Sequence, residues 1–329
     1  MPSIVNLAFA EPDQFQEHIR AAKLEVVVTA CGDYRAELQR VELNRLGLQR
    51  GRQSLPNVGR VTTPADRSLI LFLSGAEEAP AGAGKIEIRP GDIVLSPEQS
   101  QDYYRLTRNT GWASLSSPSI DLGIAAQSLG GSDLLQAYRS RIRRPPAPLM
   151  ARLQTLHKAV GDLATSAPDV LARPEVVKAL EESVLRATVA CLAGDPSSEW
   201  TGSGHHDTTI MRRLEQVLEA NEQRPLYLTE LCAKVGVSAR VLRAQCQQHL
   251  GMSPHRYLWL RRMHLARRAL TMADPVHATV TNIANDYGFG ELGRFAVTYR
   301  ALFGELPSAA LSRPPDARRP ETTCLERTA

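Results

Sequence analysis

This 329-residue sequence lacks the features of a disulfide-stabilised, zinc-binding or membrane protein. Its five cysteines are odd in number, widely scattered and without a CxxC pair, which argues against a disulfide framework and a zinc site. No apolar run approaches the roughly 18 residues that cross a membrane, and acidic residues follow the N-terminus too closely for a signal peptide. The sequence therefore predicts a cytoplasmic protein with reduced cysteines and no membrane contact.

Histidine is also missing where a β-barrel enzyme would need it. No histidine lies between His18 and His157, a span that contains the whole strand-rich region, so a histidine-bound metal of the cupin type is nearly excluded. His205 and His206 lie in a linker-like segment, where solvated side chains are expected. The sequence has no GxSxG elbow and no phosphate-binding glycine loop. We predict no catalytic residue, no metal site, no cofactor and no enzymatic activity.

Short β-rich runs occupy the chain between Leu24 and Leu115. They lie at residues 25–30, 68–74 and 85–96, and Pro90-Gly91 within the last run is typical of a turn between neighbouring strands. Helical periodicity follows, at about residues 149–163 and 175–192. The predicted fold class is α+β: an N-terminal β-barrel or sandwich of the cupin-like kind with following helices, then an all-helical C-terminal domain.

The second of these helices has a largely one-sided set of apolar residues, namely Val176, Val177, Leu180, Val184, Leu185 and Cys191. Such a face suits packing on the barrel of the same chain and a seam between two subunits equally well. We predict a homodimer formed through the first 200 residues.

Composition and charge divide the chain further. Residues 194–207 (GDPSSEWTGSGHHD) have the Gly, Pro, Ser and Thr content of a linker. Residues 208–313 hold 14 Lys and Arg against 8 Asp and Glu, a net charge of +6, whereas the remainder of the chain has a net charge of −2. The predicted domains are 1–193 and 208–313, with a disordered tail at 314–329. A basic C-terminal domain is compatible with nucleic-acid binding, although solvated helices also show such an excess.

The C-terminal domain contains one unit twice. Leu231, Cys232, Gly236 and Val237 recur 52 positions later as Ile283, Ala284, Gly288 and Phe289, and Leu242, Cys246, Leu250, Gly251 and Pro254 recur 53 positions later as Phe295, Tyr299, Phe303, Gly304 and Pro307. A small residue four positions before a glycine, followed by a second helix, is the pattern of a helix-turn-helix. Between the units, residues 254–272 predict one uninterrupted helix of roughly 28 Å. Such a strut would hold two recognition helices about 34 Å apart, one turn of DNA.

These segments resemble the AraC/XylS family of transcription regulators, whose DNA-binding domain is two helix-turn-helix units joined by a long helix. The resemblance rests on LTELCAKVGVSARVLRAQCQQHLGMSPHRYL, RRMHLARRAL and VTNIANDYGFGELGRFAVTYRALFGELPS. It implies a DNA-binding domain at 208–313 and an effector-binding and dimerisation domain at 1–193. The N-terminal part is similar to the family only in size, strand content and the RPGDIVLSP turn.

The two recognition helices differ in their capacity to contact bases. In the first, Arg240, Arg243 and Gln247 share a stripe with Ala244, where the family often has a basic residue. Arginine bonds guanine and glutamine bonds adenine, so we predict base contacts from these three. The 53-residue offset places Gly293 and Val297 at corresponding positions of the second helix, so these two are also predicted base contacts. Neither offers a side-chain hydrogen bond, and Val297 could contact a thymine methyl group.

Three further residues are predicted phosphate contacts: Ser238, Arg294 and Arg300. The predicted partners are double-stranded promoter DNA and a small effector of unknown identity and binding residues, with RNA polymerase as a further candidate. The main alternative is a DNA-binding protein whose N-terminal domain binds a protein and no metabolite. An apolar pocket inside the barrel would favour the effector hypothesis, and a filled barrel would favour the alternative.

Overall fold

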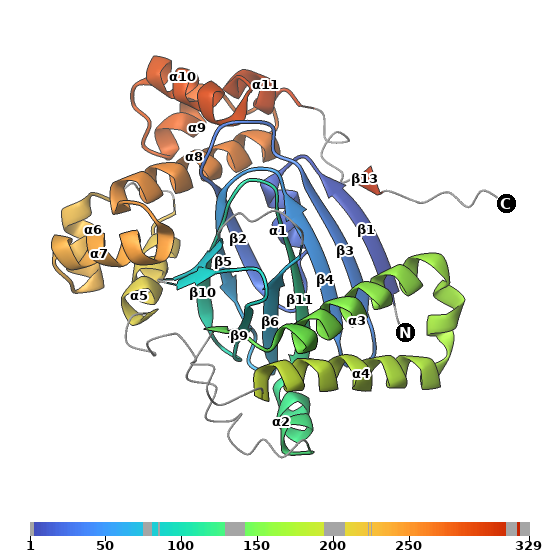
Figure 1. Ribbon diagram of the computed structural model, residues 1–329. Helices are drawn as coiled ribbons and strands as arrows, with labels where there is room; N and C mark the ends of the chain where they lie inside the picture. The colour runs from blue at the N-terminus through green and yellow to red at the C-terminus, as the bar shows by residue number, and fades with distance from the viewer. Residues whose placement is uncertain are drawn as a thin grey trace.

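The computed structural model describes residues 3–74, 81–84, 86–128, 142–193, 208–222, 224, 226–313 and 321–322. Figure 1 shows a curved body of β-strands with a helical pair (green) along one side and the C-terminal helices (yellow to red) against the other. The fold class is therefore α+β, as predicted. The N-terminal strands and the C-terminal helices lie against each other and share buried residues.

Within the described residues, the strands form two antiparallel sheets. The eight-stranded sheet has the order β12 (Ile142–Arg143), β9 (Ile93–Ser96), β6 (Arg67–Leu73), β11 (Thr110–Pro118), β4 (Gly47–Gln53), β3 (Ala36–Glu42), β1 (Ser3–Phe9) and β13 (Glu321–Thr322). The five-stranded sheet has the order β2 (Lys23–Val28), β5 (Asn57–Thr62), β10 (Gln101–Leu106), β7 (Ala81–Ala83) and β8 (Ile86–Ile88). The antiparallel N-terminal sheets that the sequence predicted are present.

The turn at Pro90-Gly91 differs from the prediction in what it connects. It follows β8 and precedes β9, but β8 pairs with β7 and β9 pairs with β6. The two strands are neighbours along the chain and lie in different sheets. Gly91 has a φ of 92°, in the left-handed region, and this allows the chain to change direction between the two layers.

Four α-helices lie in the described part of the N-terminal domain: α1 (Pro12–His18), α2 (Ser119–Ser128), α3 (Ala147–Ser166) and α4 (Pro174–Ala193). The apolar face of α4 packs on its own chain, because Val177, Val184 and Cys191 are buried with Leu48 of the barrel in one cluster. The helix α4 lies mainly against α3 and α2, so packing within its own domain accounts for most of that face. Neither α1 nor α2 was predicted, since each is short and has little helical periodicity. None of the helices in the described part of the chain is long and apolar enough to span a membrane.

The C-terminal domain consists of α5 (Thr208–Glu219), α6 (Leu228–Val235), α7 (Ala239–Leu250), α8 (Pro254–Met272), α9 (Val280–Asp286), α10 (Leu292–Phe303) and α11 (Pro307–Leu311). Both helix-turn-helix units are present, and α8 has the bounds that the sequence predicted. The glycines at the equivalent positions of the two units are all left-handed, with φ values of 79° and 77° at Gly236 and Gly288, and 70° and 76° at Gly251 and Gly304.

The chain after the second turn glycine does not return to helix at once. The helix α9 ends at Asp286 and α10 begins at Leu292, so Gly290 lies in the connection between them. In the tail that was expected to be disordered, residues 321–322 form β13 and pair with Leu7 and Ala8 of β1. A free strand edge provides the backbone groups for this pairing. The predicted linker, including His205 and His206, lies outside the described residues.

Candidate nucleic-acid interface

The first recognition helix, α7, presents the predicted contact residues to solvent. Ser238 caps this helix, because its Oγ accepts a hydrogen bond of 3.3 Å from the backbone N–H of Val241. Leu242 and Cys246 are buried on the inner side. Arg240, Arg243 and Gln247 are exposed on the outer side together with Ala244. A stripe of two guanidinium groups and an amide is therefore available for contact with base edges.

The second recognition helix, α10, has a less polar outer face. Phe295 and Tyr299 are buried against the domain core. The exposed residues include the predicted contacts Gly293, Arg294, Val297 and Arg300. Arg294 lies 4.0 Å from the carboxylate of Glu291, and both side chains are almost fully solvated. This ion pair is weak enough for a phosphate to replace it.

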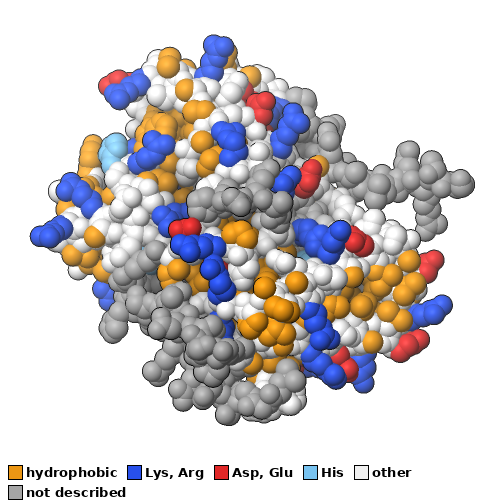
Figure 2. Space-filling model, viewed as in Figure 1, with side chains coloured by type: hydrophobic (Ala, Val, Ile, Leu, Met, Phe, Trp, Pro, Cys, Tyr) orange, Lys and Arg blue, Asp and Glu red, His pale blue; other side chains and the backbone are white. Residues whose placement is uncertain are grey.

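The helix α8 joins the two units and touches both. It packs against α7 of the first unit and against α9 and α11 of the second. The first unit and the second lie toward opposite ends of α8 in Figure 1. Figure 2 shows Lys and Arg side chains spread over these helices at the left and top of the molecule. The arrangement is that of two separated recognition helices on one basic domain.

A contact that the sequence did not predict joins the first unit to the barrel. Glu215 of α5 is only 1% exposed. Its Oε1 accepts hydrogen bonds from the hydroxyls of Tyr103 in β10 (3.2 Å) and Tyr257 in α8 (2.8 Å). The guanidinium of Arg60 in β5 lies 3.9 Å from Oε2 of Glu215 and donates to Glu219 at 2.6 Å. We call Arg60, Tyr103, Glu215 and Tyr257 the first anchor.

Apolar packing surrounds the first anchor. Val27, Val58 and Tyr103 of the barrel belong to the same buried cluster as Leu214 and Leu250 of the C-terminal domain. Burial raises the pKa of Glu215, and the positive charge of Arg60 opposes this rise. The two domains therefore share one core at this contact.

A second unpredicted contact joins the other unit to the barrel domain. Glu11, directly before α1, pairs with Arg267 of α8 at 2.9 Å and with Arg313 after α11. Glu305, after α10, pairs with the same two arginines. The guanidinium of Arg267 also lies 4.6 Å from the ring centroid of Phe303. We call Glu11, Arg267, Glu305 and Arg313 the second anchor.

A cleft of about 420 Å³ lies between the domains, lined by α1, β2, β5 and α8. Arg60 and Tyr257 of the first anchor border this cleft, and so does Arg268, which follows Arg267 of the second anchor. At its edge, the Nε2 of His264 lies 3.0 Å from the carbonyl oxygen of Val28. Burial lowers the pKa of His264 to about 4, so this ring is neutral and donates to that carbonyl. The domains thus meet at discrete contacts around a hollow.

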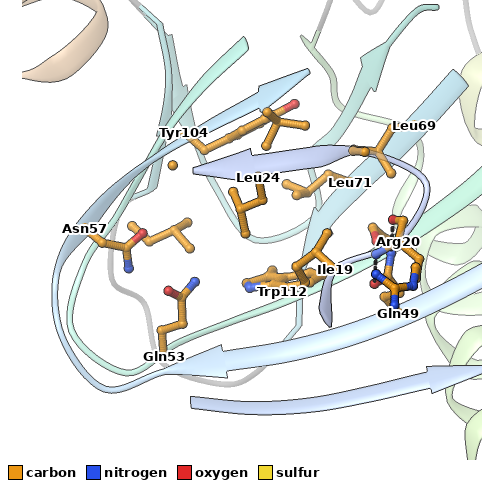
Figure 3. A pocket seen from close by; sticks show the side chains of 15 residues that line it. Ile19, Arg20, Leu24, Gln49, Gln53, Asn57, Leu69, Leu71, Tyr104 and Trp112 are labelled. Carbon is orange, nitrogen blue, oxygen red and sulfur yellow. Dashed lines mark hydrogen bonds between the residues drawn. The ribbon is translucent and has the colours of Figure 1, made fainter. Parts of the chain in front are cut away.

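A second hollow lies inside the barrel and has a volume of about 50 Å³ (Figure 3). Its walls are mainly apolar, with Leu24, Leu71 and Trp112 among the side chains that point into it. The amide of Gln49 is already bonded to the backbone of Arg20, at 2.7 and 3.1 Å.

Among the described residues, no group of three or more His, Cys, Asp or Glu side chains could hold a metal ion.

Three other polar side chains in this cavity also have partners within the protein. Gln53 accepts from the hydroxyl of Tyr34 at 3.1 Å, and Asn57 donates to the carbonyl of Leu55 at 3.0 Å. The hydroxyl of Tyr104 lies 2.7 Å from Ser96 Oγ. The cavity is therefore small and largely apolar, and Arg20 is the one charged residue among those that line it.

Comparison with known proteins finds similarity in the C-terminal domain. Residues 231–313 match a family model described as a helix-turn-helix domain. A probable thc operon regulatory protein of Rhodococcus erythropolis is 42% identical over 106 residues, which are 32% of this chain and 32% of that protein. XylDLEGF operon transcriptional activator 2 of Pseudomonas putida is 38% identical over 100 residues, or 30% of this chain and 64% of that protein.

Among solved structures, the AraC-like transcriptional activator CuxR aligns with a TM-score of 0.43 and 15% identity, over 81% of this chain and 95% of that one. The chain matches less than two thirds of the length of the two operon regulators. Similarity in sequence is thus strong for about a third of the chain.

Proposed function

Because the C-terminal domain of this chain belongs to the AraC/XylS family of helix-turn-helix transcription regulators, we propose that the protein binds promoter DNA and regulates transcription in response to a small effector. The observation that carries this proposal is the pair of recognition helices, α7 and α10, with exposed arginines on each. Arg240, Arg243 and Gln247 contact bases in this proposal. Ser238, Arg294 and Arg300 contact phosphates, and Gly293 and Val297 contact bases from the second helix without side-chain hydrogen bonds.

Binding of duplex DNA by the full chain should weaken as salt rises. Each phosphate contact contributes about −0.9 to the slope of log affinity against log salt, so the two arginines Arg294 and Arg300 predict a slope near −1.8. That slope corresponds to roughly a twelvefold loss between 50 and 200 mM salt. Fluorescence anisotropy with a labelled duplex gives the measurement. A folded chain with no affinity for DNA at 50 mM salt would refute the proposed function.

The proposed effector site is the barrel cavity of Figure 3. The amides of Gln49, Gln53 and Asn57 are already paired, and the guanidinium of Arg20 donates to the carbonyl of Glu17 at 2.9 Å. A charged ligand would therefore lose hydration and gain few partners there. A neutral, mainly apolar molecule is the class that fits. The cavity of about 50 Å³ is far below the roughly 300 Å³ of a small ligand pocket, so binding has to displace a wall.

The alternative, an N-terminal domain that binds a protein and no metabolite, is favoured by the same small volume. A barrel this nearly filled has little room for a ligand before its walls move. The two hypotheses separate on one measurement, since a small apolar compound that raises the melting temperature of the full chain supports an effector.

We also propose that the protein is a homodimer through its N-terminal domain. Most of the apolar face of α4 is used within the chain, so the seam has to use the residues that are only partly buried there, such as Val176, Leu180 and Leu185. Figure 2 shows hydrophobic side chains on the surface over α3 and α4. Light scattering of the full chain at tens of micromolar should give twice the mass of one chain. The Leu180→Glu variant should give the mass of a single chain. A monomeric wild-type chain would contradict the proposal.

A further inference from the structure

The start of the second recognition helix lacks the support that the first one has. Ser238 caps α7, whereas Glu291, the residue before α10, makes no capping hydrogen bond through its side chain. The connection into α10 contains Gly288 and Gly290, and apart from its chain neighbours no atom lies within 4 Å of where a Cβ on Gly290 would be. The backbone there has the freedom of glycine and little packing around it. The direction of α10 therefore depends on a side chain that holds this connection in place.

Phe289, between the two glycines, is that side chain. It is half-buried and packs against the core of the C-terminal domain. Its ring centroid lies 4.9 Å from that of Phe295 in α10. The guanidinium of Arg262, near the middle of α8, lies over the Phe289 ring at 5.3 Å from its centroid. A cation at this distance from the face of a ring is attracted by its π electrons, so the contact ties the start of α10 to α8.

The arginines of α8 differ in their partners. Four of the five donate to a carbonyl oxygen or pair with a carboxylate: Arg256, Arg261, Arg267 and Arg268. Arg262 differs from these four, because its contact is with the ring of Phe289. Burial lowers the pKa of Arg262, but an arginine stays protonated in proteins. The guanidinium is half-buried, and loss of water strengthens its attraction to the ring.

The first unit orients its recognition helix by other means. Val237 stands at the position equivalent to Phe289, and an aliphatic side chain has no π electrons to attract a guanidinium. In the second unit, α9 packs on α8 and α10 packs on α9, and Figure 1 shows α9 between the other two helices. A change at the start of α10 would therefore alter its direction relative to α8 and its separation from α7.

We propose that Arg262 is a positioning residue for DNA binding: through Phe289 it fixes the direction of α10 and, with it, the half-site spacing that the protein recognises. The inference rests on the proposed DNA-binding function. Two recognition helices enter successive major grooves only when the half-sites are about one helical turn apart. One base pair more or less moves a half-site by about 3.4 Å along the duplex. A helix with a fixed direction rejects such a shift, and a loosely held helix tolerates it.

Hydrogen exchange of the full chain tests the contact without DNA. Arg262→Met removes the charge and keeps a long apolar side chain. We expect exchange to rise about fivefold at the amides of Phe289 and Phe295, which both bond to backbone carbonyls at 2.9 Å. Arg262→Lys keeps a cation near the ring and should restore slow exchange. Arg268→Met, on the same helix but facing the cleft between the domains, is the matched control and should leave both amides unchanged.

Half-site spacing is the second measurement. An operator selected from a randomised pool is compared, by fluorescence anisotropy, with duplexes that carry one more or one fewer base pair between the half-sites. The wild type should prefer the selected spacing, and this preference should fall about fivefold in Arg262→Met and recover in Arg262→Lys. General destabilisation would instead lower the affinity for all three duplexes by one factor. Loss of a phosphate contact would also reduce the magnitude of the salt slope by about 0.9, whereas Arg262→Met should leave that slope unchanged.

Phe289→Leu decides whether Arg262 acts through the ring. In that background, Arg262→Met should have little further effect on exchange or on spacing preference, as expected for two side chains that form one interaction. Effects that simply add would show that the two side chains act separately and would overturn the inference. Arg262→Gln provides a second neutral variant if Arg262→Met does not fold.

Two further outcomes would contradict the inference: a folded neutral variant with unchanged exchange at both amides, or an equal loss of affinity at all three spacings. A wild-type chain that binds no DNA would refute the proposed function, whereas exchange would still show whether Arg262 holds the start of α10. The two failures are therefore distinguishable.

Discussion

Replacing Arg60 with methionine should lower the free energy of unfolding of the full chain by about 3 kcal/mol, the magnitude typical of breaking a buried ion pair by removing one partner. The loss arises because Glu215, 1% exposed, keeps its negative charge without the guanidinium that faces it. Glu25 and Glu219 also pair with Arg60, but both are partly exposed and water can replace the arginine there. Urea unfolding followed by circular dichroism gives the measurement.

The pH dependence of this loss identifies Glu215 as its cause. Burial raises the pKa of Glu215 and Arg60 lowers it, so removing Arg60 raises that pKa further. A carboxyl group whose pKa is higher in the folded state binds more protons there, and stability then increases as pH falls through that pKa. The loss of unfolding free energy in Arg60→Met, relative to the wild type, should therefore become smaller as the pH falls from 8 to 5.

Two matched variants complete the test. Arg60→Met/Glu215→Gln removes the buried charge and keeps an oxygen for the hydroxyls of Tyr103 and Tyr257, so it should recover at least half of the loss. Arg89→Met breaks an exposed ion pair with Glu87 on the same domain and should change stability by less than about 0.5 kcal/mol. If Arg60→Met alone were as stable as the wild type, or if its loss of unfolding free energy did not depend on pH, then Arg60 does not compensate the charge of Glu215.

The second large effect concerns the asymmetry between the recognition helices. Arg240→Ala and Arg243→Ala should each weaken binding to the preferred operator by about 1–3 kcal/mol, or roughly 5- to 150-fold, and relax preference at defined base pairs. Both side chains are exposed on α7 and face solvent in the free protein. Operators selected from a randomised pool should show the strongest sequence preference in the half bound by the first unit.

Arg294→Ala and Arg300→Ala should behave differently. Both variants should bind all DNA sequences more weakly and to the same extent. Each should reduce the magnitude of the slope of log affinity against log salt by about 0.9, as loss of a phosphate contact does. Arg186→Ala, an exposed arginine on α4, is the control and should leave affinity unchanged. If Arg294→Ala alone erased base preference while Arg240→Ala and Arg243→Ala had no effect, the second helix would be the principal reader.

Local patterns account for how much of the C-terminal domain could be predicted. Helix periodicity, the proline at the start of α8 and the left-handed glycines are properties of a few neighbouring residues, so the bounds Pro254–Met272 and the turns at Gly236 and Gly288 followed directly from the sequence. The same periodicity separated the buried Leu242 from the exposed Arg243. Candidate DNA contacts could therefore be chosen without a structure, although their contact with DNA stays a prediction.

Long-range contacts account for what the sequence could not predict. Nothing in the neighbourhood of Arg60 indicates that it faces Glu215, 155 positions later in the chain, because such a pair depends on how the sheet and the helices are placed in space. The apolar face of α4 is another example, since its pattern suits its own chain and a partner subunit equally, and only the packing shows that its own domain buries most of it. The sequence alone thus determined the two helix-turn-helix units and their turns. Only the tertiary structure decided that the barrel holds each unit by its own anchor, because those contacts join residues that no local pattern relates.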